Sequence, residues 1–166
     1  MINPKKYSFY EYKENYPKLF EKEKKKLTKI LPKAEIQHVG STSILGLGGK
    51  GIIDILVVLK KSELKKAQAK LEKCGYVLMP NAMGLDRISM KKDYGFLFWK
   101  RRVHVHLTWK NSKTQREMIN FKNKLMKEPK LIKYYAKLKK KAAKIAKGDG
   151  KVYRKIKNNF IKRHSR

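Results

Sequence analysis

Two segments that lie close together in the sequence carry residue types that bind phosphate and metal ions. The first ends in Gly40-Ser41-Thr42, and the second, residues 52–59, is an almost continuous apolar run that contains Asp54. A short strand that leads into a Gly-Ser turn offers backbone N–H groups and hydroxyls to a phosphate. A carboxylate inside an apolar strand is costly unless it meets a cation, a metal ion or several hydrogen-bond donors. We therefore place the candidate site between the turn and Asp54.

The connection between these two segments is rich in glycine. Residues 44–51 contain four glycines and one cation, Lys50. Glycine permits positive φ angles and a close approach of the backbone to a ligand. The pattern G-x-x-x-x-G-K-[ST] is absent, so the segment is not a Walker A loop.

A second group of candidate ligands lies on residues 102–108, where apolar and polar side chains alternate strictly. The alternation places His104 and His106 on the face opposite the apolar one. Residues two apart on a strand lie about 6.5–7 Å from each other. The two histidines can therefore reach one ligand together, or they can simply line a hydrated face of a sheet.

A nucleophilic Ser-His-Asp arrangement of Ser41, His38 and Asp54 is disfavoured. The pattern Gly-x-Ser-x-Gly is absent, and His38 precedes Ser41 by only three positions without an evident orienting partner.

The elements that must position these residues follow from hydrophobic periodicity and turn signals. We expect helices over residues 8–31, 62–74, 112–127, 129–147 and 150–161, and strands over 36–39, 52–59, 76–79, 87–91, 96–99 and 102–108. Strands followed by a run of helices indicate an α+β domain. We expect one domain, with residues 1–110 as the sheet-containing core and residues 111–166 as C-terminal helices.

Some local details of this assignment can be checked directly. Pro17 should lie in the first turn of the first helix, and Ser62 should cap the second. Cys74 should be a small core residue, and residues 92–95 should form a hairpin turn. On residues 52–59, Asp54 and Leu56 should share one face of the strand.

The composition limits the classes of protein. The net charge is +31, and residues 110–166 carry about +18 of it. Such a tail attracts polyanions, so nonspecific nucleic-acid binding is expected at low salt. The single cysteine excludes an internal disulfide and a cysteine-based zinc site. No long apolar run or signal-peptide core occurs, which favours a cytoplasmic protein without a membrane partner.

The chain resembles the GrpB family of the nucleotidyltransferase superfamily. The resemblance rests on residues 38–43 (His-Val-Gly-Ser-Thr-Ser), Lys50 and residues 52–57 (Ile-Ile-Asp-Ile-Leu-Val), and it extends to Arg87 and the His-Val-His of residues 104–106. It implies a nucleotidyltransferase-like mixed β-sheet, similar to a DNA polymerase β palm, flanked by helices and followed by basic C-terminal helices. It also implies that Gly40, Ser41 and Thr42 hold phosphate, with Lys50 and Arg87 supplying positive charge.

The superfamily binds divalent cations through carboxylates spaced Asp-x-Asp, and this chain departs from that pattern. Asp54 takes the first position and Leu56 the second, and residues 102–108 contain no acidic residue. Asp54, His104 and His106 would form a mixed nitrogen and oxygen set, better suited to Mn²⁺, Zn²⁺ or Fe²⁺ than to an octahedral Mg²⁺ site. Alternatively, His104, His106, Lys50 and Arg87 bind an anion without a metal ion.

Three functional hypotheses follow from these residues. In the first, the protein binds a nucleotide or another phosphorylated small molecule, with a divalent cation such as Mg²⁺ or Mn²⁺ at Asp54. Nucleotidyl transfer would then have to use a metal site that lacks the second carboxylate. In the second, the basic helices form a noncatalytic nucleic-acid-binding module. In the third, the domain is an adaptor whose former site is inactive.

Overall fold

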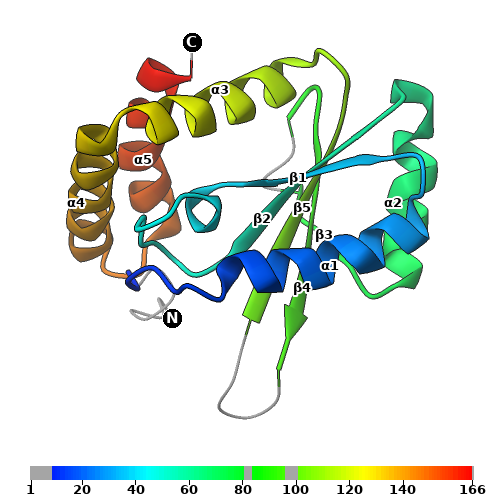
Figure 1. Ribbon diagram of the computed structural model, residues 1–166, viewed down its shortest axis with the longest axis horizontal. Helices are drawn as coiled ribbons and strands as arrows, with labels where there is room; N and C mark the ends of the chain where they lie inside the picture. The colour runs from blue at the N-terminus through cyan, green and yellow to red at the C-terminus, as the bar shows by residue number, and fades with distance from the viewer. Residues whose placement is uncertain (1–8, 81–83, 96–100, 166) are drawn as a thin grey trace.

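The fold is built on a five-stranded mixed sheet. The computed structural model describes residues 9–80, 84–95 and 101–165 (Figure 1). The strands lie in the order β1-β2-β5-β4-β3. The central pair, β2 and β5, is parallel, and the other neighbouring pairs are antiparallel. The strands are β1 (Glu35–Val39), β2 (Ile53–Leu59), β3 (Val77–Leu78), β4 (Ile88–Tyr94) and β5 (Arg101–Trp109).

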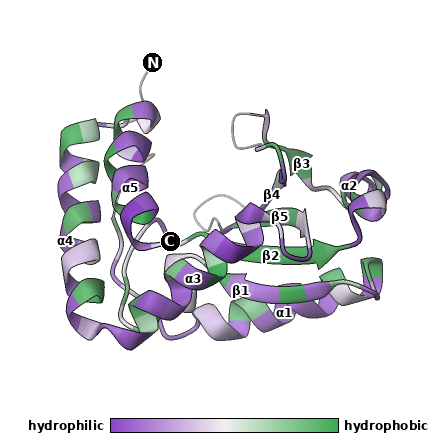
Figure 2. Ribbon diagram, turned by 90° about the horizontal axis from the view of Figure 1, so that it is seen from above, coloured by the Kyte–Doolittle hydropathy of each residue, from purple (hydrophilic) through white to green (hydrophobic). Residues whose placement is uncertain are grey.

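Helices cover both faces of this sheet and extend beyond one end of it. In the described residues these helices are α1 (Tyr16–Ile30), α2 (Leu64–Lys73), α3 (Lys113–Lys127), α4 (Pro129–Ala146) and α5 (Gly150–His164), with short 3₁₀ turns at Ser41–Ser43 and Lys61–Glu63. Helices α4 and α5 lie side by side at one end of the molecule (Figures 1 and 2). The predicted α+β class, with a mixed sheet flanked by helices and followed by three C-terminal helices, is confirmed.

The two faces of β2 are divided as the alternation predicts. Ile53, Ile55 and Val57 belong to the main core, which also includes apolar residues of α1 and α2. Leu56 and Val58 point to the opposite face, where they pack with residues of β1 and α3. Asp54 shares this second face, because side chains alternate along a strand. The carboxylate therefore faces the C-terminal helices and not α1.

The C-terminal helices also hold the glycine-rich connection in place. Ile44 and Leu47 are buried among Leu125 of α3, Tyr135 of α4 and Phe160 of α5. The rings of Tyr135 and Phe160 stack with centroids 4.7 Å apart. Side chains cap two of these helices: the Ser112 hydroxyl accepts from the backbone N–H of Gln115 at the start of α3, and the Asp149 carboxylate caps α5. The loop that leads to Asp54 is thus packed against residues from the far end of the chain.

The N-terminal helix is shorter than expected. Helix α1 begins at Tyr16, with Pro17 in its first turn as predicted, so the prediction of a helix from residue 8 is wrong for residues 9–15. Tyr10 instead forms an antiparallel bridge with Gly49, with N–O distances of 2.7 and 2.8 Å. Two long-range backbone hydrogen bonds thus replace local helical ones at this position.

Three further local expectations are corrected. Ser62 does not cap α2, because residues 61–63 form a 3₁₀ turn and the helix begins at Leu64. Cys74 is exposed at the end of α2, so it is not a core residue. Strand β4 continues through Tyr94, so residues 92–94 belong to a strand and not to a hairpin turn. The strand expected over 96–99 lies outside the described residues.

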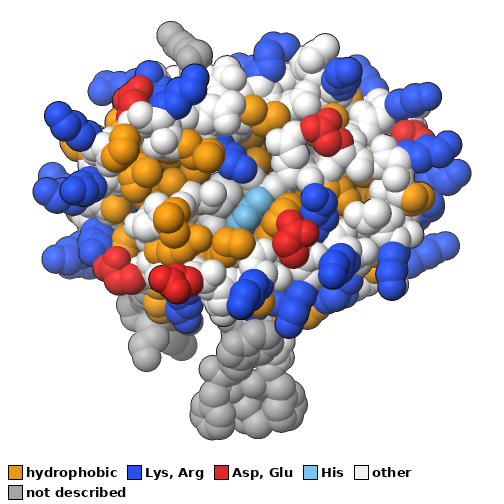
Figure 3. All heavy atoms as spheres, viewed as in Figure 1, with side chains coloured by type: hydrophobic (Ala, Val, Ile, Leu, Met, Phe, Trp, Pro, Cys, Tyr) orange, Lys and Arg blue, Asp and Glu red, His pale blue; other side chains and the backbone are white. Residues whose placement is uncertain are grey.

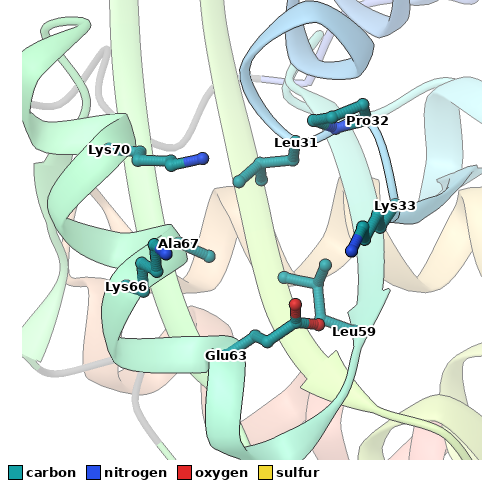
Figure 4. Close-up of a pocket in the computed structure, with 8 residues that line it drawn as sticks. All are labelled: Leu31, Pro32, Lys33, Leu59, Glu63, Lys66, Ala67 and Lys70. Atoms are coloured by element: carbon teal, nitrogen blue, oxygen red, sulfur yellow. The ribbon is translucent and has the colours of Figure 1, made fainter.

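The surface is predominantly basic, and it carries a pocket away from Asp54. Figure 3 shows lysine and arginine side chains spread around one face, with apolar side chains gathered between them towards α4. A pocket of about 270 Å³ opens between the end of α1, β2 and α2 (Figure 4). It is lined by Leu31, Pro32, Lys33, Leu59, Glu63, Lys66, Ala67 and Lys70. Within the described part of the chain, no helix is both long and apolar enough to span a membrane.

Candidate anion and metal site

The structure brings Asp54, His104 and His106 together. Asp54 Oδ1 lies 3.2 Å from His104 Nδ1 and 3.5 Å from His106 Nε2. One ligand atom from each residue lies within 4.8 Å of the others, a spacing that suits a common metal ion. Both rings are directed at Asp54, an arrangement in which the two histidines and the carboxylate can reach one ligand together.

This arrangement follows from the parallel pairing of β2 with β5. The register aligns Asp54 with His104 and Leu56 with His106, so the two histidines flank the carboxylate along β5. Ser89, fully buried on β4, lies with its Oγ 3.1 Å from His106 Nδ1. This contact leaves Nε2 directed towards Asp54. Such a partner for the second ring nitrogen fixes the orientation of a histidine that binds a ligand.

Gly40 closes the site on the side of the turn. Its φ of 71° is in the region that favours glycine, and a Cβ added there would lie 2.4 Å from Asp54 Oδ2. Neither the backbone conformation nor the available space permits a side chain. The turn therefore passes directly against the carboxylate, as the sequence hypothesis requires.

The two hydroxyl residues of the turn have different surroundings. Ser41 is half-buried, and its Oγ lies against Gly49 of the glycine-rich connection. Thr42 is buried, and its hydroxyl donates to the carbonyl of Ile52 and lies 3.0 Å from His38 Nε2. The structure thus directs the Thr42 side chain into the protein, and Ser41 offers the hydroxyl on the side of the connection.

The predicted cations lie near Asp54. Lys50 and Arg87 are both half-buried, and Asp54 acts electrostatically on each of them. Lys50 also lies over the ring of Tyr153 on α5, with Nζ 5.4 Å from the centroid. Arg87 immediately precedes β4, next to Asp86, whose carboxylate accepts two hydrogen bonds from Thr114.

Two further lysines of this region were missed by sequence reasoning. Lys139 of α4 is only 3% exposed, and Lys157 of α5 is half-buried. The available signal was helical spacing: Lys139 lies between Tyr135 and Ala142 on one stripe. Lys157 lies between Tyr153 and Phe160 in the same way. A lysine at such a position is directed into the protein and not into water.

The charges of the site perturb each other. Burial opposes ionisation of Asp54, but hydrogen bonds from His104 and His106 outweigh it and hold the Asp54 pKa well below its usual range. Burial lowers the pKa of His106, which keeps its ring neutral and able to bind a metal ion. Burial, together with the charge of Lys157, lowers the pKa of Lys50 to about 8 and that of Lys139 to about 7.

The donor set fits one cation of borderline softness and does not fit a pair of Mg²⁺ ions. Leu56 is completely buried and has no donor atom at the position where the superfamily pattern needs a second carboxylate. One carboxylate and two imidazoles match the preferences of Mn²⁺, Fe²⁺ or Zn²⁺. Asp54, His104 and His106 are the residues that would hold such an ion.

His38 has a structural environment. Its ring stacks on Phe20 of α1 with centroids 4.6 Å apart, and its Nε2 lies next to the Thr42 hydroxyl. Burial, together with the charge of Lys122, lowers the His38 pKa to about 4. The ring pairs with Thr42 on the α1 side of the sheet, an arrangement that does not support a Ser41-His38-Asp54 triad.

Comparison with known proteins places this site within a family. The model of the family described as "GrpB protein" matches residues 7–166. The chain belongs to the GrpB family. The family expectation drawn from residues 38–43 and 52–57 is therefore confirmed.

Individual relatives agree with this assignment. The glutamate-rich protein GrpB of Alkalihalophilus pseudofirmus is 30% identical over 155 residues, which cover 90% of this chain and 88% of that protein. A UPF0157 protein of Halalkalibacterium halodurans is 44% identical over 71 residues, but the match spans only 41% of this chain and 36% of that protein.

Solved structures give the same result. The crystal structure of the conserved protein GrpB from Enterococcus faecalis matches 95% of this chain and 94% of its own, with 28% identity and a TM-score of 0.81. The Cid1 poly(U) polymerase matches 77% of this chain and 44% of its own, with 14% identity and a TM-score of 0.46, too low a likeness to bear on function.

Proposed function

We propose that this protein binds a nucleotide or another phosphorylated small molecule between the Gly40-Ser41 turn and Asp54. The observation that carries the proposal is the meeting of Asp54, His104 and His106 directly beside a turn whose glycine has no room for a side chain. The turn would present backbone N–H groups and the Ser41 hydroxyl to phosphate, while Lys50 and Arg87 would supply charge. A divalent cation bound at Asp54, His104 and His106 would supply further neutralisation of phosphate charge.

Ligand binding is better supported than nucleotidyl transfer. Transfer by paired metal ions needs clustered oxygen ligands to hold both ions, which in turn stabilise the attacking and the leaving oxygen. This site offers a single carboxylate, and the apolar Leu56 is next to it on the same face. We therefore propose binding as the function, with the side chains of β2 and β5 orienting one cation or a polar group of the ligand.

Thermal unfolding in the presence of ATP tests this proposal. At millimolar ATP with Mn²⁺, we expect the Tm of the wild-type protein to rise by about 3–6 °C, because a ligand that binds only the folded state stabilises it. Ser41→Ala should lose most of this rise. Ser62→Ala is the matched control, since Ser62 is an exposed serine in the 3₁₀ turn before α2.

Two results would contradict the proposal. The first is the absence of any ATP-induced shift at millimolar concentration in the wild-type protein. The second is an equal shift in the wild type and in Ser41→Ala, which would place binding elsewhere on this basic protein.

A further inference from the structure

The pocket between α1, β2 and α2 lies where three elements end or begin. Helix α1 ends at Ile30, β2 ends at Leu59 and α2 begins at Leu64. The floor of the pocket consists of Leu31, Leu59 and Ala67, which are buried and belong to the main core (Figure 4). Because the side chain of Ala67 is a single methyl group, α2 leaves space above the core at this point. The pocket therefore offers apolar surface at its base.

Charged side chains surround this apolar floor. Lys33, Lys66 and Lys70 line the pocket together with one carboxylate, that of Glu63. Figure 4 shows the ends of the Lys33, Lys70 and Glu63 side chains directed over the floor. The aliphatic stem of a lysine can pack on apolar surface while its ammonium group stays in water. The rim thus places ammonium groups at the mouth of a pocket whose base is apolar.

A second hollow shows that these charges alone do not make a site. It is lined by Glu21, Lys24, Lys25, Thr28 and Lys29, so it also combines three lysines with one glutamate. All its lining residues lie on α1, and none of them is apolar. Exposed charges contribute little by themselves, because water and salt screen them. The pocket differs from this hollow in its apolar floor and in walls that come from three elements.

We propose that the pocket binds a carboxylic acid with an apolar chain of medium length. The carboxylate lies at the mouth between the ammonium groups of Lys33 and Lys70, and the chain covers Leu31, Leu59 and Ala67. The volume of about 270 Å³ lies just below the usual range for small-molecule sites, so the ligand is small. A ligand of this class uses both properties that the pocket combines, and the hollow on α1 offers only one of them.

This site is separate from the one around Asp54. Leu59 and Asp54 lie near opposite ends of β2, roughly 17 Å apart along an extended strand. Their side chains also belong to opposite faces of the sheet, since Leu59 is part of the main core on the side of α1 and α2. The inference therefore does not depend on the proposed function, and either can fail without the other.

NMR titration of the ¹⁵N-labelled full chain with sodium octanoate tests this inference. At about 150 mM salt, where exposed charges are largely screened, we expect saturable shifts of the backbone amide signals of Leu31, Leu59 and Ala67. Each buried methylene strengthens binding by roughly three- to fourfold, so octanoate should bind at least about tenfold more tightly than acetate. Octylamine, which carries a cation in place of the carboxylate, should give no saturable shifts at these residues.

Charge reversal tests the position of the carboxylate. Lys33→Glu and Lys70→Glu should each weaken octanoate binding by about fivefold or more, because an attractive charge becomes a repulsive one. The matched control is Lys25→Glu in the hollow on α1, which should change the affinity less than about twofold. All three lysines are exposed, so these variants are expected to fold.

Filling the pocket tests the position of the chain. Ala67→Leu should abolish the saturable shifts, because the larger side chain occupies the space above the floor. Ala69→Leu, at an exposed position of the same helix, is the control and should bind octanoate as the wild type does. The dispersion of the amide signals checks folding, and the lysine variants decide the question if Ala67→Leu does not fold.

Three results would overturn the inference. The first is the absence of saturable shifts at the floor residues with octanoate. The second is equal affinity for octanoate and acetate, which would reduce the interaction to surface charge. The third is equal octanoate affinity in Lys33→Glu, Lys70→Glu and Lys25→Glu, which would show that the pocket does not recognise the carboxylate.

Discussion

Two carboxylates of this protein are withdrawn from water on opposite faces of the same sheet, and their partners differ. Glu23 of α1 is fully buried and accepts hydrogen bonds from the hydroxyls of Tyr76 and Tyr94, the latter at 2.7 Å. Asp54 of β2 is paired with His104 and His106 and surrounded by lysines and arginine. The first carboxylate is mainly held by neutral donors, and the second lies among cations.

The difference separates a structural carboxylate from a candidate functional one. Burial and the hydrogen bond to Glu23 raise the pKa of both tyrosines, so these hydroxyls stay protonated and keep donating. Lys26 adds a contact to Glu23 at 3.5 Å, and this group is complete within the protein. Asp54 instead meets two histidines whose ligand atoms, together with its own carboxylate, could hold one metal ion.

The largest expected effect is on stability, at Glu23. Glu23→Leu should lower the free energy of unfolding by about 3 kcal/mol, because the hydroxyls of buried Tyr76 and half-buried Tyr94 lose a charged acceptor. Denaturation with urea measures the change, and Glu21→Leu on the exposed side of α1 is the control. The ATP-induced rise of the Tm should be the same as in the wild type. A large loss of affinity in folded Glu23→Leu would show that the two faces of the sheet are not independent.

Asp54→Asn should affect ligand binding strongly and stability only weakly, the reverse of what we expect for Glu23→Leu. We expect Mn²⁺ affinity to fall tenfold or more, about 1.4 kcal/mol or greater, while the free energy of unfolding changes by less than in Glu23→Leu. Titration of Mn²⁺ followed by electron paramagnetic resonance measures the affinity. An Asp54→Asn protein that binds Mn²⁺ and ATP as the wild type does would favour an adaptor with an inactive site.

The buried lysines predict a pH dependence of stability. Lys139 has a pKa of about 7 and Lys50 of about 8 in the folded protein, both below the ordinary value of 10.5. Above pH 7 the unfolded chain therefore holds more protons than the folded one, so stability rises with pH.

We expect the free energy of unfolding to increase by roughly 3–4 kcal/mol between pH 7 and 9. Lys139→Met should be more stable than the wild type at pH 7, and its gain should shrink towards pH 9. The charged groups that act on Lys139 are Lys157 and Asp54, so Lys157→Met should also flatten the profile. Urea denaturation at several pH values provides the measurement, and a stability that falls over this range would contradict the assignment.

The smallest effects are expected from exposed cations of the same helices. Lys137→Met and Lys155→Met should change the free energy of unfolding by less than about 0.5 kcal/mol. Their contribution to nucleic-acid binding should be generic, so RNA and DNA binding should vanish above about 200 mM salt. Binding that survives higher salt and depends on residues 130–164 would instead support the nucleic-acid-binding alternative.

Periodicity predicted the parts of the site that lie on strands. Alternation was sufficient to place Leu56 on the face of Asp54 and to place the two histidines on one face of β5. Glu23 lies at helical spacing from Phe20 and Leu27, and all three residues are buried on one face of α1. Hydrophobic periodicity predicts these positions correctly because each strand or helix buries one face, and the buried face fixes which residues point inward.

The features that were not predicted from the sequence depend on contacts between distant segments of the chain. The start of α1 was misplaced because Tyr10 pairs with Gly49, a pairing that no local propensity contains. Lys139 and Lys157 were overlooked because lysine is ordinarily a surface residue, although each occupies a position within an apolar stripe. Their burial becomes understandable only when α4, α5 and the glycine-rich connection are seen packed together.

The parallel pairing of β2 with β5 has a consequence for how the protein folds. Asp54 and His104 are aligned neighbours in the sheet but are separated in sequence by α2, β3 and β4. Contacts between residues so far apart in the sequence form slowly, because a long loop must lose conformational entropy before the strand pairing can stabilise the fold. The cations of α4 and α5 join later still along the chain. We therefore expect ligand affinity to recover only in the last kinetic phase of refolding, and a nascent chain that ends before α4 to carry the histidines without the lysines.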